Sequence, residues 1–339
     1  ILTDIVTPIF TLSDSKIKPT ITTNPDKSNG NAISYLKEND TLIFSYNTNK
    51  DVCFKNKLPF LYINLGGKEV VANFDGILDE YKNKVIFSYK IQAGDCQTKN
   101  NFTNKNIYIK KDPISGITYS NGTNSDVIDK AGNTFNCNTI SRYPENDTLS
   151  NYVIYTDSPN IISDNGIIVS GTSNNGFYNK GKQITIDFLF NRNIVVIGTP
   201  NLNVLIGSDT VQVPFNSVVD ERKIRFVYTV ADGENDIDGL SISSNQITLP
   251  DGVFIKDLAG NNANLLYKGF THNPLFKIDT TPPKILKYTP SHNGEMEAYS
   301  VVILEFDEKI RYIGSGNITM EYQNNGVNTT EILTYDAIN

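Results

Sequence analysis

Short runs in which apolar and polar side chains alternate recur along the whole chain. Clear examples are residues 41–46, 184–188, 224–230 and 302–306, which are rich in Val, Ile, Thr, Tyr and Phe. Clusters of Asn, Asp, Gly, Pro and Ser, the residues that favour turns, separate these runs. We find no segment with a sustained helical period and capping residues. The pattern predicts an all-β protein built from β-sandwiches.

The alternating runs belong to an internal repeat, because residues 31–160 match residues 174–284 in four ordered segments. Tyr89 falls on Tyr228 and Gly94 falls on Gly233. The first copy is longer near residues 100–124, which predicts a loop insertion. The matching segments are 45–52 with 187–194, 84–95 with 223–234, 129–133 with 257–261, and 157–161 with 279–285.

Both ends of the chain carry further pieces of the repeat. Residues 6–12 resemble 272–278, a final strand, and residues 300–310 resemble 183–194. A half sandwich exposes an apolar sheet face and an unpaired edge, so we expect its missing strands in a longer array or a neighbouring chain. The predicted domains are a last strand or linker at 1–17, a sandwich at 18–159, a second at 160–281, and the first part of another at 282–339.

Four motifs of the second copy resemble the bacterial Ig-like tandem repeats of S-layer proteins and large surface adhesins. They are Phe-Asn-Arg-Asn-Ile at 190–194, the Tyr-to-Leu stretch at 228–240, Asp-Leu-Ala-Gly-Asn at 257–261, and Ile-Asp-Thr-Thr-Pro-Pro at 278–283. The resemblance implies tandem Ig-like β-sandwich domains in an elongated array. The paired prolines favour a semi-rigid linker.

The same resemblance implies a structural role at the cell surface, outside the cell. The chain would be a building block of an S-layer, a surface filament or another cell-surface assembly, with copies of itself and neighbouring repeats of the same chain as partners. The alternatives are an adhesin stalk or a module that binds glycans or proteins, and accessory domains of a secreted enzyme. For a binding module, the 100–124 insertion offers Tyr108 and Tyr119 as contact residues.

Composition narrows the remaining classes of partner. The chain has 339 residues and a formal net charge of −7, from 30 Lys and Arg against 37 Asp and Glu. We find no basic stripe, which argues against a nucleic-acid partner. No apolar run approaches the roughly 18–20 residues of a membrane helix, so we predict no membrane-spanning segment.

Two groups of carboxylates are candidate calcium ligands, because calcium prefers several oxygen atoms. The first is an acidic loop of alternating carboxylates, for which a solvated loop is the competing interpretation: Asp232, Glu234, Asp236 and Asp238. The second lies at the predicted junctions: Asp129, Asp157, Asp257 and Asp279. Asp129 and Asp257 are equally well explained as caps of their own turns.

The cysteines and the glycosylation sequons leave alternatives open. Two of Cys53, Cys96 and Cys137 would pair in an exported protein, with three pairings possible, or all three stay reduced. The six Asn-x-Ser/Thr sequons are either glycosylation sites or triplets that occur by chance: Asn39, Asn101, Asn121, Asn146, Asn317 and Asn328.

The sequence offers no catalytic or cofactor-binding residues. Neither His272 nor His292 has a neighbouring nucleophile and orienting acid in sequence. Phosphate-binding glycine loops and Cys/His zinc spacings are not found. We therefore expect a protein that is not an enzyme.

Overall fold

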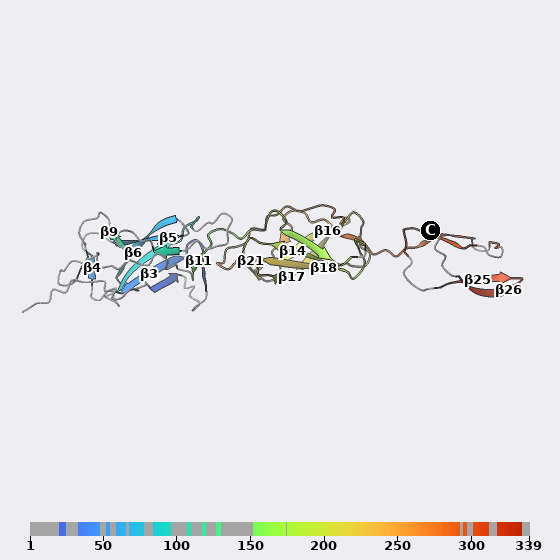
Figure 1. Ribbon diagram of the computed structural model, residues 1–339, viewed down its shortest axis with the longest axis horizontal. Coiled ribbons are helices and arrows are strands. Elements are labelled where there is room, and N and C mark those ends of the chain that lie inside the picture. The colour runs from blue at the N-terminus through green and yellow to red at the C-terminus, as the bar shows by residue number, and fades with distance from the viewer. Residues whose placement is uncertain are drawn as a thin grey trace, which may run out of the picture. The chain divides into compact units, whose positions relative to one another are not determined.

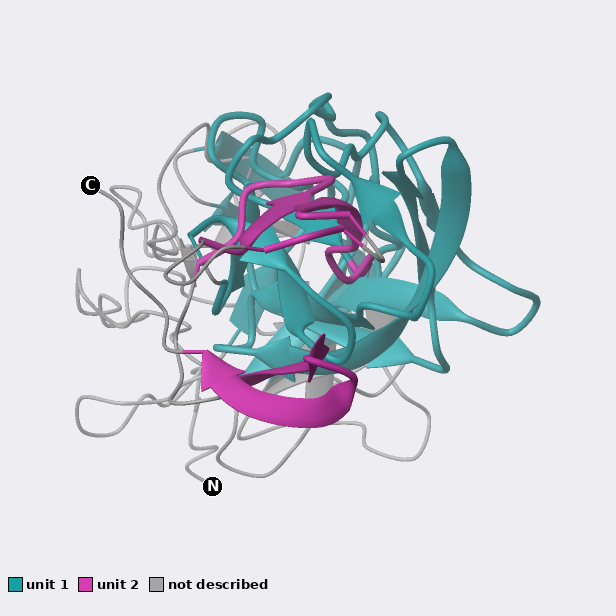
Figure 2. Cartoon of the chain, turned by 90° about the vertical axis from the view of Figure 1, so that its right-hand side faces the viewer, with its two compact units in different colours: residues 1–279 teal, residues 280–339 magenta. Residues whose placement is uncertain are grey.

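The computed structural model consists of β-strands and connecting segments throughout the part of the chain it describes. The described residues are 20–24, 33–47, 52–54, 59–65, 68–77, 84–95, 107–109, 117–119, 127–129, 152–173, 175–291, 294–296, 301–311 and 317–333. Two compact units, Ile1–Asp279 and Thr280–Asn339, are coloured separately in Figure 2. The predicted all-β class is confirmed for these residues. No helix that could cross a membrane occurs among them.

Unit 1 holds two successive sets of strands, which we call the first and second strand sets. The first set is β1 (Thr20–Asn24), β2 (Ser34–Leu36), β3 (Thr41–Asn47), β4 (Val52–Phe54), β5 (Pro59–Leu65), β6 (Lys68–Ile77), β7 (Lys84–Lys90), β8 (Ile107–Ile109), β9 (Ile117–Tyr119), β10 (Val127–Asp129) and β11 (Tyr152–Ile154). The second set is β12 (Ile167–Gly171), β13 (Phe177–Tyr178), β14 (Gln183–Leu189), β15 (Ile194–Ile197), β16 (Asn201–Ile206), β17 (Asp209–Val219), β18 (Lys223–Thr229), β19 (Asn235–Asp236), β20 (Ile247–Thr248), β21 (Phe254–Asp257) and β22 (Lys277–Asp279).

The two strand sets share one sheet order. The main sheet of the first set runs β1-β3-β7-β6-β5-β8, with β9 also paired to β5, and that of the second runs β12-β14-β18-β17-β16-β20. In each set a short strand pairs in parallel with the last strand, β2 with β11 and β13 with β22. Figure 1 shows β14, β17 and β18 side by side. The internal repeat read from sequence therefore corresponds to a repeated topology.

The register of the central strands reproduces the sequence match of residues 84–90 with 223–229. Tyr89 lies opposite Leu42 in the first set, and Tyr228 lies opposite Ile184 in the second. The central strands β7 and β18 each pair with a strand that contains a β-bulge. The bulge follows Phe74 in β6 and Phe215 in β17. Gly94 and Gly233 have nearly the same positive φ, 85° and 86°.

The core of the second strand set lies between its main sheet and the smaller sheets β13-β22-β19 and β15-β21. Alternate residues of β14, β16 and β18 point into it, as a half-buried strand requires. Phe188 and Phe226 from the main sheet and Ile278 from β22 are fully shielded from solvent. Each such side chain contributes roughly 1.5–3 kcal/mol by leaving water. This packing of sheet on sheet is consistent with the β-sandwich class.

The predicted loop insertion at residues 100–124 is wrong in part. Residues 107–109 and 117–119 are the strands β8 and β9, and both pair with β5. In the second set, the corresponding strand β16 is paired in the same way, by β20 and by the bridge between Leu205 and Ser241. The short β-branched runs in this region complete a sheet edge, so Tyr108 and Tyr119 belong to strands.

Unit 2 consists of two β-hairpins that belong to separate sheets. One joins β23 (Ile285–Thr289) to β24 (Ile303–Phe306), and the other joins β25 (Ile318–Asn324) to β26 (Val327–Leu333). None of the described side chains of unit 2 is buried, and Leu286 is 70% exposed. A set of strands that buries no apolar side chain has no core of its own.

Candidate functional site: a polar joint around Arg192

The acidic loop at residues 232–238 does not gather its carboxylates around one point. Asp232 pairs with Lys180 at 2.8 Å, and both side chains are exposed. Glu234 accepts a hydrogen bond from the backbone N–H of Ala231 at 2.9 Å. The lysine, at hydrogen-bond distance, lowers the pKa of Asp232. Asp232 and Glu234 thus have different partners.

Asp236 and Asp238 interact with each other and hold the base of the same loop. The buried Asp236 accepts backbone N–H groups from Gly207 and Gly239, each at 2.8 Å. Desolvation raises the pKa of Asp236, with the neighbouring Asp238 adding to it. Hydrogen bonding to Asp236 lowers the pKa of Asp238, which also contacts His272 Nδ1 at 3.0 Å.

Within the described part of the chain, no three or more His, Cys, Asp or Glu side chains form a group that could hold a metal ion. The loop carboxylates instead accept hydrogen bonds from backbone turns and form ion pairs. This agrees with the interpretation of a solvated loop, except that one of the carboxylates is buried. Calcium binding by this loop stays a prediction.

The second predicted group is partly brought together, around Arg192. The Arg192 guanidinium donates to Asp157 Oδ2 at 2.8 Å, to the Asp157 carbonyl oxygen at 3.2 Å, and to Asp257 Oδ2 at 3.3 Å. The Arg192 side chain is 9% exposed, Asp257 0% and Asp157 46%. A cation therefore lies between two of the carboxylates predicted to bind calcium, and it is supplied by the protein.

The turn that follows β21 places Asp257 for this contact. Its Oδ1 accepts the backbone N–H groups of Ala259 at 3.0 Å and Asn261 at 2.9 Å, so Asp257 caps its own turn as one interpretation predicted. Gly260 adopts the expected positive φ, 91°. Oδ1 of Asp257 therefore accepts hydrogen bonds from the turn, while Oδ2 accepts one from Arg192.

Two further residues complete the joint. The Arg192 guanidinium lies 4.5 Å from the centre of the Tyr155 ring, which is a cation–π contact. Asn261 Nδ2 donates to Asp257 Oδ2 at 3.0 Å and to the Tyr155 carbonyl oxygen at 2.8 Å. Burial is the main cause that raises the pKa of Tyr155, and the positive charge of Arg192 works against it.

The joint connects the end of the first strand set to the second. Tyr155 and Asp157 directly follow β11, whereas Arg192 lies between β14 and β15 and Asp257 ends β21. Asn160 and Asn264 add a backbone bridge between the same two segments. The contacts among these residues are hydrogen bonds, two ion pairs and a cation–π contact, all made by one guanidinium and its neighbours.

Sequence analysis missed Arg192, Tyr155 and Asn261, and it missed a related site in the first strand set. Asp95, whose side chain is 0% exposed, contacts Lys68 Nζ and the Tyr89 hydroxyl, each at 2.7 Å. The internal repeat could have identified Asp95, because Asp95 aligns with Glu234. Each of the two carboxylates accepts a hydrogen bond from the backbone N–H of the residue three positions before it.

The equivalence of Asp157 with Asp279 is wrong. Leu36 lies opposite Ile154, and its counterpart Tyr178 lies opposite Ile278. Counting on from these isoleucines makes Tyr155, not Asp157, the counterpart of Asp279. The sequence match is wrong here because both segments contain an acidic residue before a proline. In the aligned structures these two acidic residues are two positions apart.

The other predicted sites are placed as follows. The backbone of Asp129 lies in β10 and that of Cys53 in β4, while Cys96, Cys137 and His292 lie outside the described residues. His272 is exposed, with a φ of 50°. Of the six sequons, Asn39, Asn317 and Asn328 are exposed, and Asn101, Asn121 and Asn146 lie outside the described residues.

A scan of protein-family models and a search of curated proteins return no match to this chain. The resemblance to bacterial Ig-like repeats therefore stays a prediction. What the geometry defines by itself is an all-β protein with a repeated strand order and a polar joint between the two repeats.

Proposed function

We propose that the chain is a structural segment of an extracellular cell-surface protein, in which tandem Ig-like sandwiches form an S-layer, a filament or a comparable assembly. The observation that carries the proposal is the joint around Arg192. Arg192 of the second strand set contacts the buried Asp257 of the same set and the 46% exposed Asp157 in the segment that follows β11. A contact of this kind restricts motion between consecutive repeats, which is useful in a load-bearing or lattice-forming array and unnecessary in independent binding modules.

Two other features support the same role. The same strand order occurs in both strand sets, as an array of similar domains requires. The carboxylates of Asp236 and Asp257 accept backbone N–H groups of turns, so these two side chains stabilise the fold. The acidic net charge of −7 favours opposed basic patches or divalent cations where copies meet.

Electron microscopy of the purified chain, with and without a calcium chelator, tests this proposal. Ordered sheets or filaments support the structural role, and their loss on chelation supports calcium at the contacts. A chain that stays strictly monomeric at high concentration with calcium present contradicts self-assembly.

Thermal unfolding with added calcium tests the acidic loop separately. If the loop binds calcium, the melting temperature rises with calcium in the wild type and in Asp251→Asn, an exposed carboxylate outside the cluster, but not in Asp238→Asn. An equal response of all three proteins excludes the loop as the site.

A further inference from the structure

Asparagine followed by glycine is a chemically reactive pair, and its reactivity depends on the backbone around it. The chain contains six Asn-Gly pairs, and three of them lie wholly in the part that the structure describes: 165–166, 175–176 and 325–326. The three asparagines are all exposed and all have a positive φ, of 59°, 52° and 50°. The asparagines are therefore alike, and differences in reactivity depend on how the glycines are held.

The reaction of such a pair needs no reagent other than water. The glycine backbone nitrogen loses its proton and attacks the side-chain carbonyl carbon of the asparagine, a C–N bond forms, and ammonia leaves. Water then opens the resulting succinimide ring at either of its two carbonyl carbons, which yields aspartate or isoaspartate. Glycine favours ring closure because it has no Cβ and a wide range of accessible φ. An acceptor that holds the glycine N–H, or close packing of the backbone, hinders the reaction.

Hydrogen bonds hold Gly176 in place. Its backbone N–H donates to Ser173 Oγ at 3.2 Å, and its carbonyl oxygen accepts the backbone N–H of Lys277 at 3.2 Å. Lys277 belongs to β22, whose next residue, Ile278, is fully buried in the core of the second strand set. The nitrogen that would attack is thus engaged, and its turn is tied to a buried strand.

Close packing holds Gly166. This residue is buried, and its carbonyl oxygen accepts the backbone N–H of Leu189 at 2.8 Å. A Cβ added to Gly166 would lie 1.9 Å from the Ile162 carbonyl oxygen, so its backbone lies directly against the preceding turn. The backbone rotation that ring closure requires at Asn165 would disturb this packing.

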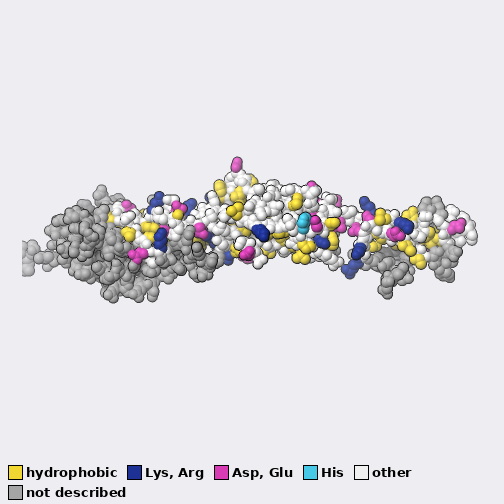
Figure 3. Space-filling model, turned by 90° about the horizontal axis from the view of Figure 1, so that it is seen from above, with side chains coloured by type: hydrophobic (Ala, Val, Ile, Leu, Met, Phe, Trp, Pro, Cys, Tyr) yellow, Lys and Arg dark blue, Asp and Glu magenta, His cyan; other side chains and the backbone are white. Residues whose placement is uncertain are grey.

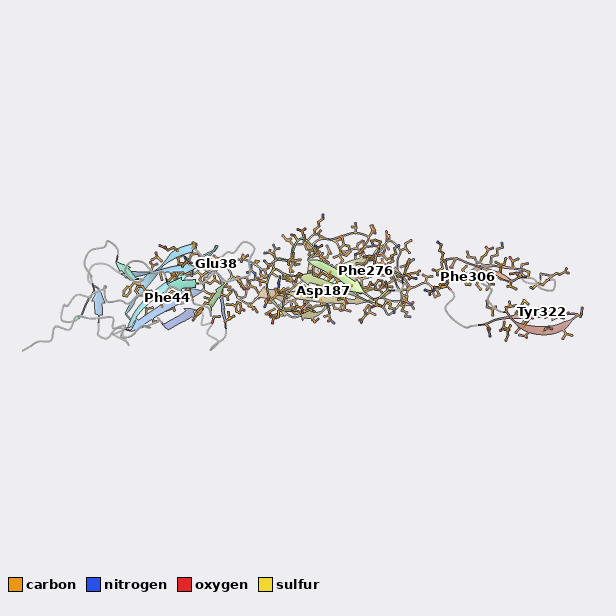
Figure 4. All side chains as sticks on the ribbon, viewed as in Figure 1. Glu38, Phe44, Asp187, Phe276, Phe306 and Tyr322 are labelled. Carbon is orange, nitrogen blue, oxygen red and sulfur yellow. The ribbon has the colours of Figure 1, made fainter. Side chains whose placement is uncertain are left out.

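Neither restraint acts on Gly326. Asn325 and Gly326 are the central residues of the β25–β26 hairpin, between the paired residues Asn324 and Val327. A positive φ at both, 50° and 79°, is typical of a type I′ turn. Both residues are exposed, and a Cβ added to Gly326 would have no atom within 4 Å. The Gly326 N–H makes no hydrogen bond to another described residue. Figure 1 labels this hairpin, and Tyr322 marks it in Figure 4.

We infer that Asn325 is a site of spontaneous deamidation, whereas the fold of the second strand set protects Asn165 and Asn175. Aspartate at position 325 preserves the turn, because Asp-Gly also favours type I′. Isoaspartate lengthens the main chain by one carbon atom, so a two-residue turn no longer fits the register of β25 with β26. This inference does not depend on the proposed function.

Either product adds one negative charge to the surface. Figure 3 shows Lys, Arg, Asp and Glu side chains spread over the described surface, without one large patch of either sign. Solvent and salt screen a single exposed charge on such a surface. We therefore expect the altered main chain of isoaspartate, and not the added charge, to change the hairpin.

Incubation of the whole chain at mildly alkaline pH, followed by proteolysis and mass spectrometry, tests the inference. Asn325 should lose its amide at least fivefold faster than Asn165 and Asn175, and faster still as the pH rises, since the glycine nitrogen must lose its proton. In urea the three rates should agree within threefold, because each asparagine precedes a glycine. This comparison uses one protein and separates the effect of the fold from that of local sequence.

Variants of the chain then test the structural causes. Ser173→Ala removes the acceptor of the Gly176 N–H and should accelerate deamidation of Asn175 at least threefold, with Asn325 unchanged. The isoaspartate form, separated by chromatography, should show faster hydrogen exchange at residues 318–333 than the unmodified chain. Asn325→Asp is the matched control: it carries the same charge on a normal main chain and should exchange like the wild type.

Two results would overturn the inference. The first is a rate at Asn325 in the folded chain that is equal to or below that at Asn165 or Asn175. The second is a set of rates that stays the same in urea, since local sequence and not the fold would then determine which asparagine reacts.

Discussion

Replacing Arg192 by Met tests the joint between the two strand sets most directly. Methionine keeps an unbranched side chain of comparable length but removes the guanidinium, and with it three hydrogen bonds at 2.8, 3.2 and 3.3 Å. Breaking a buried ion pair from one side typically costs about 3–5 kcal/mol, because the other charge stays buried without its partner.

The expected cost here is smaller, because Asp257 keeps part of its hydrogen bonding. Ala259 and Asn261 still donate to its carboxylate, and Asp157 is 46% exposed, so water can replace the arginine there. The exposed contact contributes at most about 1 kcal/mol. We expect Arg192→Met to lower the free energy of unfolding by about 2–3 kcal/mol.

Urea unfolding followed by circular dichroism measures this change, since the chain contains no tryptophan. Hydrogen exchange at residues 152–160 and 254–264 reports whether both sides of the joint loosen together. A double-mutant cycle with Asp257→Asn isolates the interaction energy of the Arg192–Asp257 pair. We expect Asp257→Asn to lower the free energy of unfolding less in the Arg192→Met background than in the wild type. Asp157→Asn is the matched control, with an expected loss below about 1 kcal/mol.

The reasoning fails if Arg192→Met changes the free energy of unfolding by less than about 0.5 kcal/mol, the usual range for surface substitutions. It also fails if exchange accelerates only on the side of the second strand set. In either case the guanidinium would not couple the two strand sets.

Three further predictions concern the second strand set. Gly239→Ala should destabilise it by several kcal/mol, roughly what a steric clash at a strained backbone position costs, because its new Cβ would lie 1.9 Å from the Asn273 carbonyl oxygen. Gly252→Ala, also at positive φ but with open space around it, should cost only about 1 kcal/mol in the same urea titration. Burial raises the pKa of Tyr267 to about 12, above its unfolded value, so stability present below pH 10 should fall as the pH rises from 10 to 12. Tyr267→Phe should remove that part of the alkaline loss, and tyrosinate absorbance against pH measures the titration. Phe188→Ala should cost about 3–5 kcal/mol by leaving a cavity in the core, measured as the shift of the urea midpoint.

Local sequence was sufficient wherever a feature depends on neighbouring residues. Alternation in residues 184–188 predicts a strand because successive side chains of a strand point to opposite faces. The Ala-Gly-Asn turn predicts the positive φ of Gly260 because glycine has no Cβ to clash. The match of Tyr89 with Tyr228 predicted equal positions in two sheets, since a shared pattern of apolar residues specifies a shared register.

Only the tertiary structure decided what each carboxylate does. Asp232, Asp236 and Asp238 lie within seven consecutive positions, and their spacing indicated a common ion. Their partners Lys180, Gly207 and His272 come from distant parts of the sequence. Asp232 is bound to Lys180, whereas Asp236 and Asp238 interact with each other.

The same holds at the joint, where the sequence grouped Asp157 and Asp257 with Asp129 and Asp279 as candidate calcium ligands. The cation between Asp157 and Asp257 is Arg192, which the sequence presents as one basic residue among 30. Its burial depends on the packing of the Tyr155 ring and the turn after β21 around it. Local sequence determines strands and turns because these depend on backbone preferences; a buried charge pair depends on which distant segments the fold brings within a few ångströms.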